Sequence, residues 1–200
     1  MVIILCGESG SGKDALLKKM VDDGCIPIIS TTSRPIRDGE TDGVEYNFVT
    51  RKQFENLIKE DRLIEYRTYN TLVGGKPDVW YYGALKEELD DSRVYVVILD
   101  IEGTKSFITH FGKNRCFVSY IHVDDAVREK RARLRGSFDK TEWDRRLADD
   151  RKVFSKDAVR SVADIVVSNN GTLNECYCKI KDSFAEHCFK NAACFSPKSS

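Results

Sequence analysis

The chain has 200 residues, of which 41% are hydrophobic, and this length and composition suit one folded domain with a sizeable core. Lys and Arg together number 32, as do Asp and Glu, so the overall charge gives no indication of nucleic-acid or membrane binding. The amino-terminal residues lack the pattern of a signal peptide, and no apolar stretch is long enough to span a membrane. We therefore expect a cytoplasmic protein that binds neither nucleic acid nor membranes.

The cysteines are odd in number and scattered along the chain, which is typical of reduced thiols in a cytosolic protein. Cys176 and Cys178 stand one residue apart with His187 nearby, which is not a usual zinc spacing. Ordinary thiols are the favoured interpretation, and a metal site there stays open as the lesser alternative. The seven cysteines are Cys6, Cys25, Cys116, Cys176, Cys178, Cys188 and Cys194.

The first predicted element is a short apolar strand, residues 3–6, that runs into a glycine-rich loop and a helix. Gly7, Gly12 and Lys13 fit the pattern G-x-x-x-x-G-K. Glycines allow backbone N–H groups to turn toward phosphate oxygens, and the helix that follows directs its positive end at them. The pattern therefore predicts a phosphate-binding loop, in which Lys13 adds a mobile positive charge.

The residue after Lys13 departs from that pattern. A Ser or Thr is expected there to hold a magnesium ion, and this chain has Asp14. Carboxylate oxygen also suits magnesium, as a direct ligand or through a bound water. We expect Asp14 to alter the metal shell without abolishing it.

Residues 26–29 predict a second apolar strand, after which residues 33–48 contain turn-formers and charges and predict a loop-rich lobe. Thr50 and Gln53 form a capping box for a short helix. Residues 63–66 and 80–82 predict strand segments around a Gly74-Gly75 turn, with Pro77 limiting any pairing nearby.

The second half of the chain alternates between helices and strands. Because strands that alternate with helices form parallel sheets, the sequence predicts an α/β fold with helices on both faces and ligands at the carboxyl ends of the strands. Asp124 begins an arginine-rich helix that residues 136–140 interrupt, and Thr172 and Glu175 form a second capping box. The predicted helices are 84–90, 102–111, one from Asp124, one from Thr141 and one from Thr172 to about 187, and the predicted strands are 94–100, 116–123 and 165–167.

From Ile3 to about the final helix, the sequence resembles the guanylate kinase family of P-loop nucleoside monophosphate kinases. The most specific part is Ser30-Thr31-Thr32-Ser33-Arg34-Pro35-Ile36-Arg37-Asp38-Gly39-Glu40 with Gly43 and Tyr46-Asn47-Phe48, which is similar to the family's monophosphate-binding segment. Further matches are Ile64-Glu65-Tyr66, Tyr81-Tyr82-Gly83, Leu99-Asp100-Ile101-Glu102 and Lys130-Arg131.

The resemblance implies one domain, residues 1–190, with a P-loop NTPase-type parallel sheet. Its core would be residues 1–30, 84–123 and 145–187, its nucleoside monophosphate (NMP) lobe residues 31–83 and its short lid residues 124–144. Residues 190–200 would form a frayed tail.

The resemblance also implies roles for individual residues. ATP would bind to Gly7, Glu8, Ser9, Gly10, Ser11, Gly12, Lys13 and Asp14, and the catalytic residues would be Lys13, Arg131, Arg135 and Arg146. The acceptor phosphate would be held by Arg34, Arg37, Tyr46 and Tyr82, and the guanine would contact Ser30, Glu65 and Glu102. Asp14 and Asp100 would serve the metal. For Arg128 and Arg133 we favour a solvated helix face.

Besides Asp14, two features depart from the family pattern near the expected base site. Ala84 stands where a Ser or Thr is usual, so one hydroxyl contact to the base is missing. The stretch 68–79 is longer than expected and could reshape the base pocket.

The expected activity is magnesium-dependent transfer of the γ-phosphoryl group of ATP to GMP or dGMP, by a monomer or weak homodimer. Guanine offers two adjacent donors to a carboxylate, so AMP and CMP should be rejected. The alternatives are a kinase for another nucleoside or deoxynucleoside monophosphate and a catalytically silent guanylate kinase-like binding module.

Overall fold

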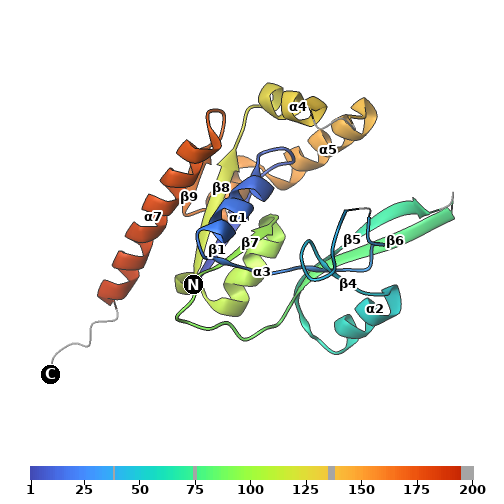
Figure 1. Ribbon diagram of the computed structural model, residues 1–200, viewed down its shortest axis with the longest axis horizontal. Coiled ribbons are helices and arrows are strands. Elements are labelled where there is room, and N and C mark those ends of the chain that lie inside the picture. Colours follow the sequence, from blue (N-terminus) through green and yellow to red (C-terminus); the bar gives the residue numbers. More distant parts are fainter. Residues whose placement is uncertain (38, 74–75, 135–137, 195–200) are drawn as a thin grey trace. The chain divides into compact units, whose positions relative to one another are not determined.

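A computed structural model describes residues 1–37, 39–73, 76–134 and 138–194 of the chain. The chain forms two compact units, one made of Met1–Ile26 with Val94–Ser200 and the other of Pro27–Arg93 (Figure 1). The predicted catalytic residue Arg135, the expected Gly74-Gly75 turn and tail residues 195–200 lie outside the described residues. The second unit contains the predicted NMP lobe, 31–83, and extends beyond it at both ends.

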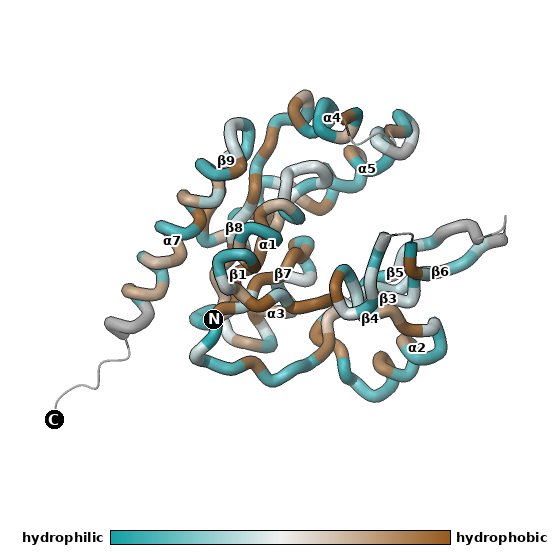
Figure 2. The backbone as a smooth tube through the Cα atoms, viewed as in Figure 1, coloured by the Kyte–Doolittle hydropathy of each residue, from teal (hydrophilic) through white to brown (hydrophobic). Residues whose placement is uncertain are grey.

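The first unit is built on a five-stranded sheet whose central strand is β1 (Val2–Cys6), and the predicted α/β fold is confirmed. Every residue of β1 is buried, as expected of a parallel strand covered on both faces. β1 pairs in parallel with β7 (Tyr95–Leu99) and β8 (Cys116–His122), and β8 pairs in parallel with β9 (Ile165–Ser168). The remaining strand is β2 (Ile26–Pro27), beside β7. Hydrophobic residues run through the central strands (Figure 2).

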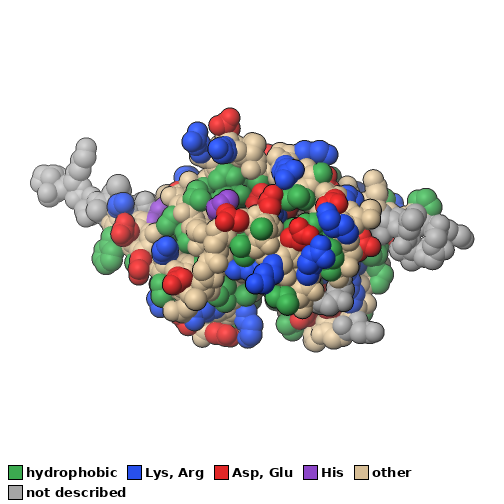
Figure 3. All heavy atoms as spheres, turned by 90° about the horizontal axis from the view of Figure 1, so that it is seen from above, with side chains coloured by type: hydrophobic (Ala, Val, Ile, Leu, Met, Phe, Trp, Pro, Cys, Tyr) green, Lys and Arg blue, Asp and Glu red, His purple; other side chains and the backbone are tan. Residues whose placement is uncertain are grey.

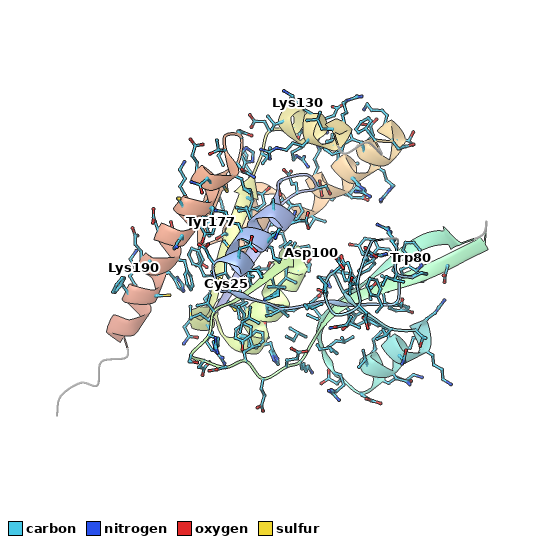
Figure 4. All side chains as sticks on the ribbon, viewed as in Figure 1. Cys25, Trp80, Asp100, Lys130, Tyr177 and Lys190 are labelled. Carbon is cyan, nitrogen blue, oxygen red and sulfur yellow. The ribbon has the colours of Figure 1, made fainter. Side chains whose placement is uncertain are left out.

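Helices cover both faces of this sheet. Because successive strand residues face opposite sides, Ile3 and Leu5 join one core with α1 (Lys13–Asp22) and α7 (Leu173–Cys194). Tyr177 on α7 is buried in this core (Figure 4). On the other face, α3 (Ile101–Phe111) contacts β1, β7 and β8 and packs against α6 (Lys156–Val162).

Several sequence predictions for this unit need correction. The helix α6 was not predicted, although Ser155 caps it by accepting a hydrogen bond from the Ala158 N–H. The helix α7 extends to Cys194, beyond the predicted start of a frayed tail at residue 190. The arginine-rich region contains α4 (Asp125–Leu134) and α5 (Lys140–Val153), and the short 3-10 helix η1 (Lys113–Arg115) precedes β8.

The second unit contains a four-stranded sheet in the order β4, β3, β6, β5. The predicted capping box is confirmed: the Thr50 side chain accepts from the Gln53 N–H, and Gln53 accepts from the Thr50 N–H, at the start of α2 (Arg51–Lys59). Phe54 of α2 is fully buried, and its ring stacks on Tyr81 at 5.2 Å. The strands are β3 (Thr31–Thr32), β4 (Asn47–Phe48), β5 (Leu63–Val73) and β6 (Lys76–Leu85).

The strands β5 and β6 pair over a longer stretch than the sequence predicts. Pairing continues out to Val73 opposite Lys76, so Pro77 does not limit it. β3 pairs with β6 only at Tyr82 and Gly83, so at Pro77 only one side of β6 takes part in the described pairing, a position that tolerates proline. The predicted helix 84–90 is also wrong, because β6 continues to Leu85 opposite Leu63 and residues 86–90 have no regular structure.

On the face drawn in Figure 3, Lys and Arg side chains lie interspersed among Asp and Glu. Within the described residues, no helix is long and apolar enough to cross a membrane.

Candidate active site

The glycine-rich loop of residues 7–12 joins β1 directly to α1. Gly12 is the N-cap of α1, with φ 95°, and a Cβ added there would lie 2.6 Å from Asn169 Nδ2. A Cβ at Gly7 would lie 2.7 Å from the Ile121 carbonyl oxygen. Both positions require glycine, because the backbone passes so close to its neighbours that a side chain would clash. A glycine backbone in such a loop can direct N–H groups at a ligand bound at the start of α1.

The Lys13 side chain folds back over this loop. Its Nζ donates hydrogen bonds to the carbonyl oxygens of Gly7, at 2.7 Å, and Glu8, at 2.9 Å, and lies 3.3 Å from Ser11 Oγ. Burial lowers the pKa of the Lys13 ammonium, while the nearby Asp14 carboxylate raises it. These contacts hold a positive charge inside the loop, where phosphate oxygens could replace the carbonyl acceptors.

Arg128 of α4 is fully buried, so its prediction as part of a solvated helix face is wrong. Its guanidinium donates to Ser9 O and Asp150 Oδ2, each at 2.9 Å, and to Asp125 Oδ1 at 2.6 Å. Asp150 in turn accepts from the Ser9 N–H at 2.9 Å. Arg128 therefore ties the glycine loop to α4 and α5. Sequence reasoning missed this role because its carboxylate partner on α5 lies 22 residues away along the chain.

Glu8 is part of the same network, with its carboxylate 3.5 Å from the Arg128 guanidinium. Burial raises the pKa of Glu8, against the lowering effect of Arg128. The network thus places three carboxylates around one buried cation beside the loop. Arg133, by contrast, is exposed as predicted and pairs with Glu129 on its own helix.

Two of the predicted catalytic arginines fall within the described residues. Arg131 Nη2 donates to the Asn169 carbonyl at 2.7 Å, and Nη1 is buried with no hydrogen-bond partner among the described residues. A Cβ at Gly12 would lie 3.9 Å from that Nη1, so the structure brings Arg131 to the loop. Arg146 lies exposed on α5.

Asn169 is a site residue that sequence reasoning missed. It is 1% exposed, and its Nδ2 donates to the Ser11 carbonyl at 2.8 Å while its own carbonyl accepts from Arg131. The signal was available, because Asn169 directly follows β9 and the carboxyl ends of parallel strands carry ligand sites. We assign Asn169 to positioning the glycine loop.

Asp14 and Asp100 are the predicted metal carboxylates. Asp14 is exposed in the first turn of α1. Asp100 lies where β7 ends and caps α3 by accepting from the Gly103 N–H at 2.7 Å (Figure 4). Within the described residues, no three His, Cys, Asp or Glu residues form a cluster that could hold a metal by themselves. Magnesium usually takes one or two carboxylates and completes its shell with substrate phosphates and water, so the chemistry of either carboxylate suits that ion, and their role in holding it stays a prediction.

In the second unit, Arg34 is 3% exposed and its guanidinium forms a two-pronged pair with the Glu40 carboxylate at 2.8 and 2.9 Å. The guanidinium also lies over the Tyr46 ring, 5.5 Å from its centroid. The rings of Tyr46 and Tyr82 meet edge to face at 5.6 Å. The structure therefore brings together three of the predicted phosphate-binding residues, while Arg37 is exposed and donates its backbone N–H to Glu40.

The three residues predicted to contact guanine have different surroundings. Glu65 lies on β5 with only 9% of its side chain exposed. Ser30 is half-buried before β3, and its carbonyl accepts from the Asn47 N–H. Glu102 belongs to the first unit, where its side chain is 65% exposed and pairs with Lys105 at 2.6 Å. A joint role for the two glutamates stays a prediction.

Three features define this chain as a P-loop nucleotide-binding protein. They are a parallel sheet, a glycine loop with a lysine folded over it, and a helix that begins without a side-chain cap. The Guanylate kinase family model matches residues 1–187. The chain belongs to the guanylate kinase family, which confirms the resemblance read from its sequence.

Two known proteins are similar to this chain. A guanylate kinase of Sulfurimonas denitrificans is 34% identical over 117 residues, covering 56% of this chain and 53% of that protein. The match thus spans about half the length of this curated relative. A crystal structure of guanylate kinase from Anaplasma phagocytophilum has a TM-score of 0.60 at 20% identity, covering 94% of this chain and 86% of that chain. This second likeness concerns the fold.

Proposed function

We propose that this protein transfers the γ-phosphoryl group of ATP to GMP or dGMP, giving ADP and GDP or dGDP. The observation that carries the proposal is Lys13, whose ammonium lies 2.7 and 2.9 Å from two loop carbonyls at the start of α1, in a chain that matches the guanylate kinase family over residues 1–187. The structure of residues 7–14 suits the triphosphate of ATP.

The acceptor nucleotide is assigned to the second unit. Arg34 presents a planar fork that matches phosphate oxygens, and the hydroxyls of Tyr46 and Tyr82 add donors without adding charge. Glu40 occupies the Arg34 fork, so phosphate binding would exchange one anion for another. Arg37 supplies a further cation from the same loop.

The chemistry needs little covalent work from the protein, because phosphoryl transfer depends mainly on positioning and on neutralising phosphate oxygens. Lys13 would exchange its carbonyl acceptors for oxygens of the transferred group. Arg131, with one nitrogen already buried beside the loop, would do the same from α4, together with the predicted partners Arg135 and Arg146.

Asp14 and Asp100 would hold magnesium through carboxylate oxygen. A bound magnesium ion supplies positive charge to the donor phosphates. Because Asp14 adds a negative charge where a neutral hydroxyl is usual, it should disfavour ATP without its divalent ion. Asp100 keeps its place through its bond to the Gly103 N–H.

The test is ADP formation from ATP with GMP, dGMP, AMP, CMP, UMP and dTMP as acceptors, for the wild type, Lys13→Met and Lys18→Met. Lys18 is the matched control, because it carries the same charge on α1 but is exposed and pairs only weakly with Asp22. We expect turnover with GMP and dGMP, loss of at least a hundredfold in Lys13→Met, and no change in Lys18→Met.

Preference for another monophosphate would identify the protein as a kinase for that nucleotide. Absence of turnover with every acceptor would identify a catalytically silent binding module. Equal activity of the wild type and Lys13→Met would contradict the assignment of the loop.

A further inference from the structure

The long hairpin of β5 and β6 carries a row of side chains beside Glu65. Glu65 lies directly opposite Ala84, and the next pair on the same face is Arg67 opposite Tyr82. These pairs share a face because side chains alternate along a strand and opposite residues of an antiparallel pair point the same way. The face extends to Trp80 on β6 (Figure 4), which pairs with Tyr69.

The opposite face of the hairpin is covered by α2. Tyr66 and Gly83 form the intervening pair, and a Cβ added at Gly83 would lie 3.2 Å from the Phe54 ring. Tyr81, two residues from Gly83, stacks on the same ring. Arg67 therefore belongs to the face that α2 leaves uncovered.

The same face also carries the proposed phosphate-binding residues. Tyr82, opposite Arg67, contacts the Tyr46 ring, and the Arg34 guanidinium lies over Tyr46. A nucleotide with its phosphate at Tyr46 and Tyr82 and its base at Glu65 would thus contact side chains of one face within one unit. Arg67 stands on that face between Glu65 and the exposed Tyr69.

The Arg67 guanidinium lies close to the Glu65 carboxylate. Its Nη1 is 3.6 Å from Glu65 Oε2 and donates a hydrogen bond to the Tyr66 carbonyl at 2.8 Å. The Arg67 side chain is 32% exposed and the Glu65 side chain 9%. Ala84, across from Glu65, is buried and offers only a methyl group. On this face a cation, Arg67, therefore lies beside the Glu65 carboxylate, whereas Ala84 has no hydroxyl to donate.

Guanine requires both kinds of partner, on two adjacent edges. The N1–H and N2 amine of its Watson–Crick edge are donors that a carboxylate accepts, and the O6 and N7 of its Hoogsteen edge are acceptors that need a donor. Arginine is the side chain that most often donates to O6 and N7 of guanine, because its fork reaches both atoms. An ionised Glu65 has no donor to offer these two acceptors.

We infer that Arg67 is a specificity-determining residue that donates hydrogen bonds to O6 and N7 of the acceptor guanine, while Glu65 accepts from N1–H and N2. This inference rests on the proposed function and deepens it, because it names a residue that donates to the base on the face where Ala84 has no hydroxyl. A Glu–Arg pair without base contact would be only an ion pair across two residues of β5. The two cases differ in how they respond to the atoms of the base.

The experiment compares wild type, Arg67→Met, Arg67→Lys and Arg51→Met with dGMP and 7-deaza-dGMP, which lacks the N7 acceptor. Arg51 is the matched control, since it is an exposed arginine of the same unit, on α2, paired with Glu55 at 2.9 Å. The readouts are KM and kcat for each acceptor, KM for ATP, and dGMP affinity by calorimetry without ATP.

Arg67→Met should raise KM and Kd for dGMP about 10- to 100-fold and leave the KM for ATP unchanged. The increase in KM and Kd should be clearly smaller with 7-deaza-dGMP. Arg67→Lys keeps the charge without the fork and should also lose the discrimination between dGMP and its 7-deaza analogue. Arg51→Met should match the wild type. Urea midpoints of all variants should agree, because both arginines lie at least partly exposed.

The inference is overturned if Arg67→Met binds dGMP within twofold of the wild type, or if its loss is the same for dGMP and 7-deaza-dGMP. In either case the proposed kinase activity stands, provided that the wild type uses dGMP. If the wild type turns over neither GMP nor dGMP and binds neither in calorimetry, the proposed function and the guanine contact both fail.

Discussion

Replacing Arg128 with Met tests whether the buried network holds the phosphate-binding loop to the helices beside it. Methionine keeps much of the side chain's length but removes its charge and all its donors. Asp125 and Asp150 would then lose hydrogen bonds of 2.6 and 2.9 Å, and Glu8 would lose its ion pair. Three carboxylates would remain close together around a site without its cation.

The expected loss in free energy of unfolding follows from burial. Removing one member of a buried ion pair costs about 3–5 kcal/mol, because the remaining charges are left without compensation. Asp125 is half exposed and can regain water, whereas Asp150 has a side chain only 12% exposed. We therefore expect a loss near the lower end, about 3 kcal/mol, which for a protein of this size lowers Tm by about 6–12 °C.

The assay is urea unfolding of Arg128→Met beside Arg133→Met, a matched control on the same helix. Arg133 is exposed, pairs with Glu129 and lies 4.2 Å from the centroid of the Phe138 ring, so Arg133→Met should lower the free energy of unfolding by no more than about 1 kcal/mol. Because Arg128 and Asp150 hold the backbone of Ser9, Arg128→Met should also raise KM for ATP more than KM for GMP. Equal unfolding midpoints for the two variants, or an unchanged KM for ATP, would refute this reasoning.

Three further predictions concern GMP binding, the magnesium dependence and the pH dependence of stability. Arg34→Ala should weaken GMP binding about tenfold or more while changing ATP binding little, since charge-assisted hydrogen bonds contribute about 1.5–3 kcal/mol; an equal loss for both nucleotides in calorimetry would count against the assignment. Asp14→Thr should retain activity and shift the magnesium concentration for half-maximal rate, and outright inactivation would point to a different role. Burial raises the pKa of Glu8, so the folded protein binds that proton more tightly than the unfolded chain does. The stability from this group should therefore be present at low pH and decline as the pH rises from the usual glutamate range through the raised pKa, and Glu8→Gln should flatten that decline in urea titrations at several pH values; an unchanged slope would contradict it.

Local signals in the sequence were sufficient for much of the fold. The apolar run of β1, the loop glycines and the two capping boxes each depend on residues close together in the chain, and the structure contains all of them. The family followed from the segment around Arg34. These features could be read because their physical causes lie within one turn or one strand.

Features that depend on distant partners could not be read in the same way. The burial of Arg128 depends on Asp150 of another helix, and the contact between Asn169 and Ser11 spans 158 positions. The pairing of β5 with β6 beyond the predicted strands at 63–66 and 80–82 also depends on the partner strand and not on a local signal. Exposure of Glu102 likewise depends on how α3 packs on the sheet.

The most direct test of the central claim is a single-turnover reaction of the wild-type protein with GMP and ATP labelled in the γ-phosphate. The account predicts that the label appears in the β-phosphate of GDP, with little inorganic phosphate, and that Lys13→Met forms neither product at a comparable rate. Label released mainly as inorganic phosphate, or labelled GDP formed equally well by Lys13→Met, would contradict it.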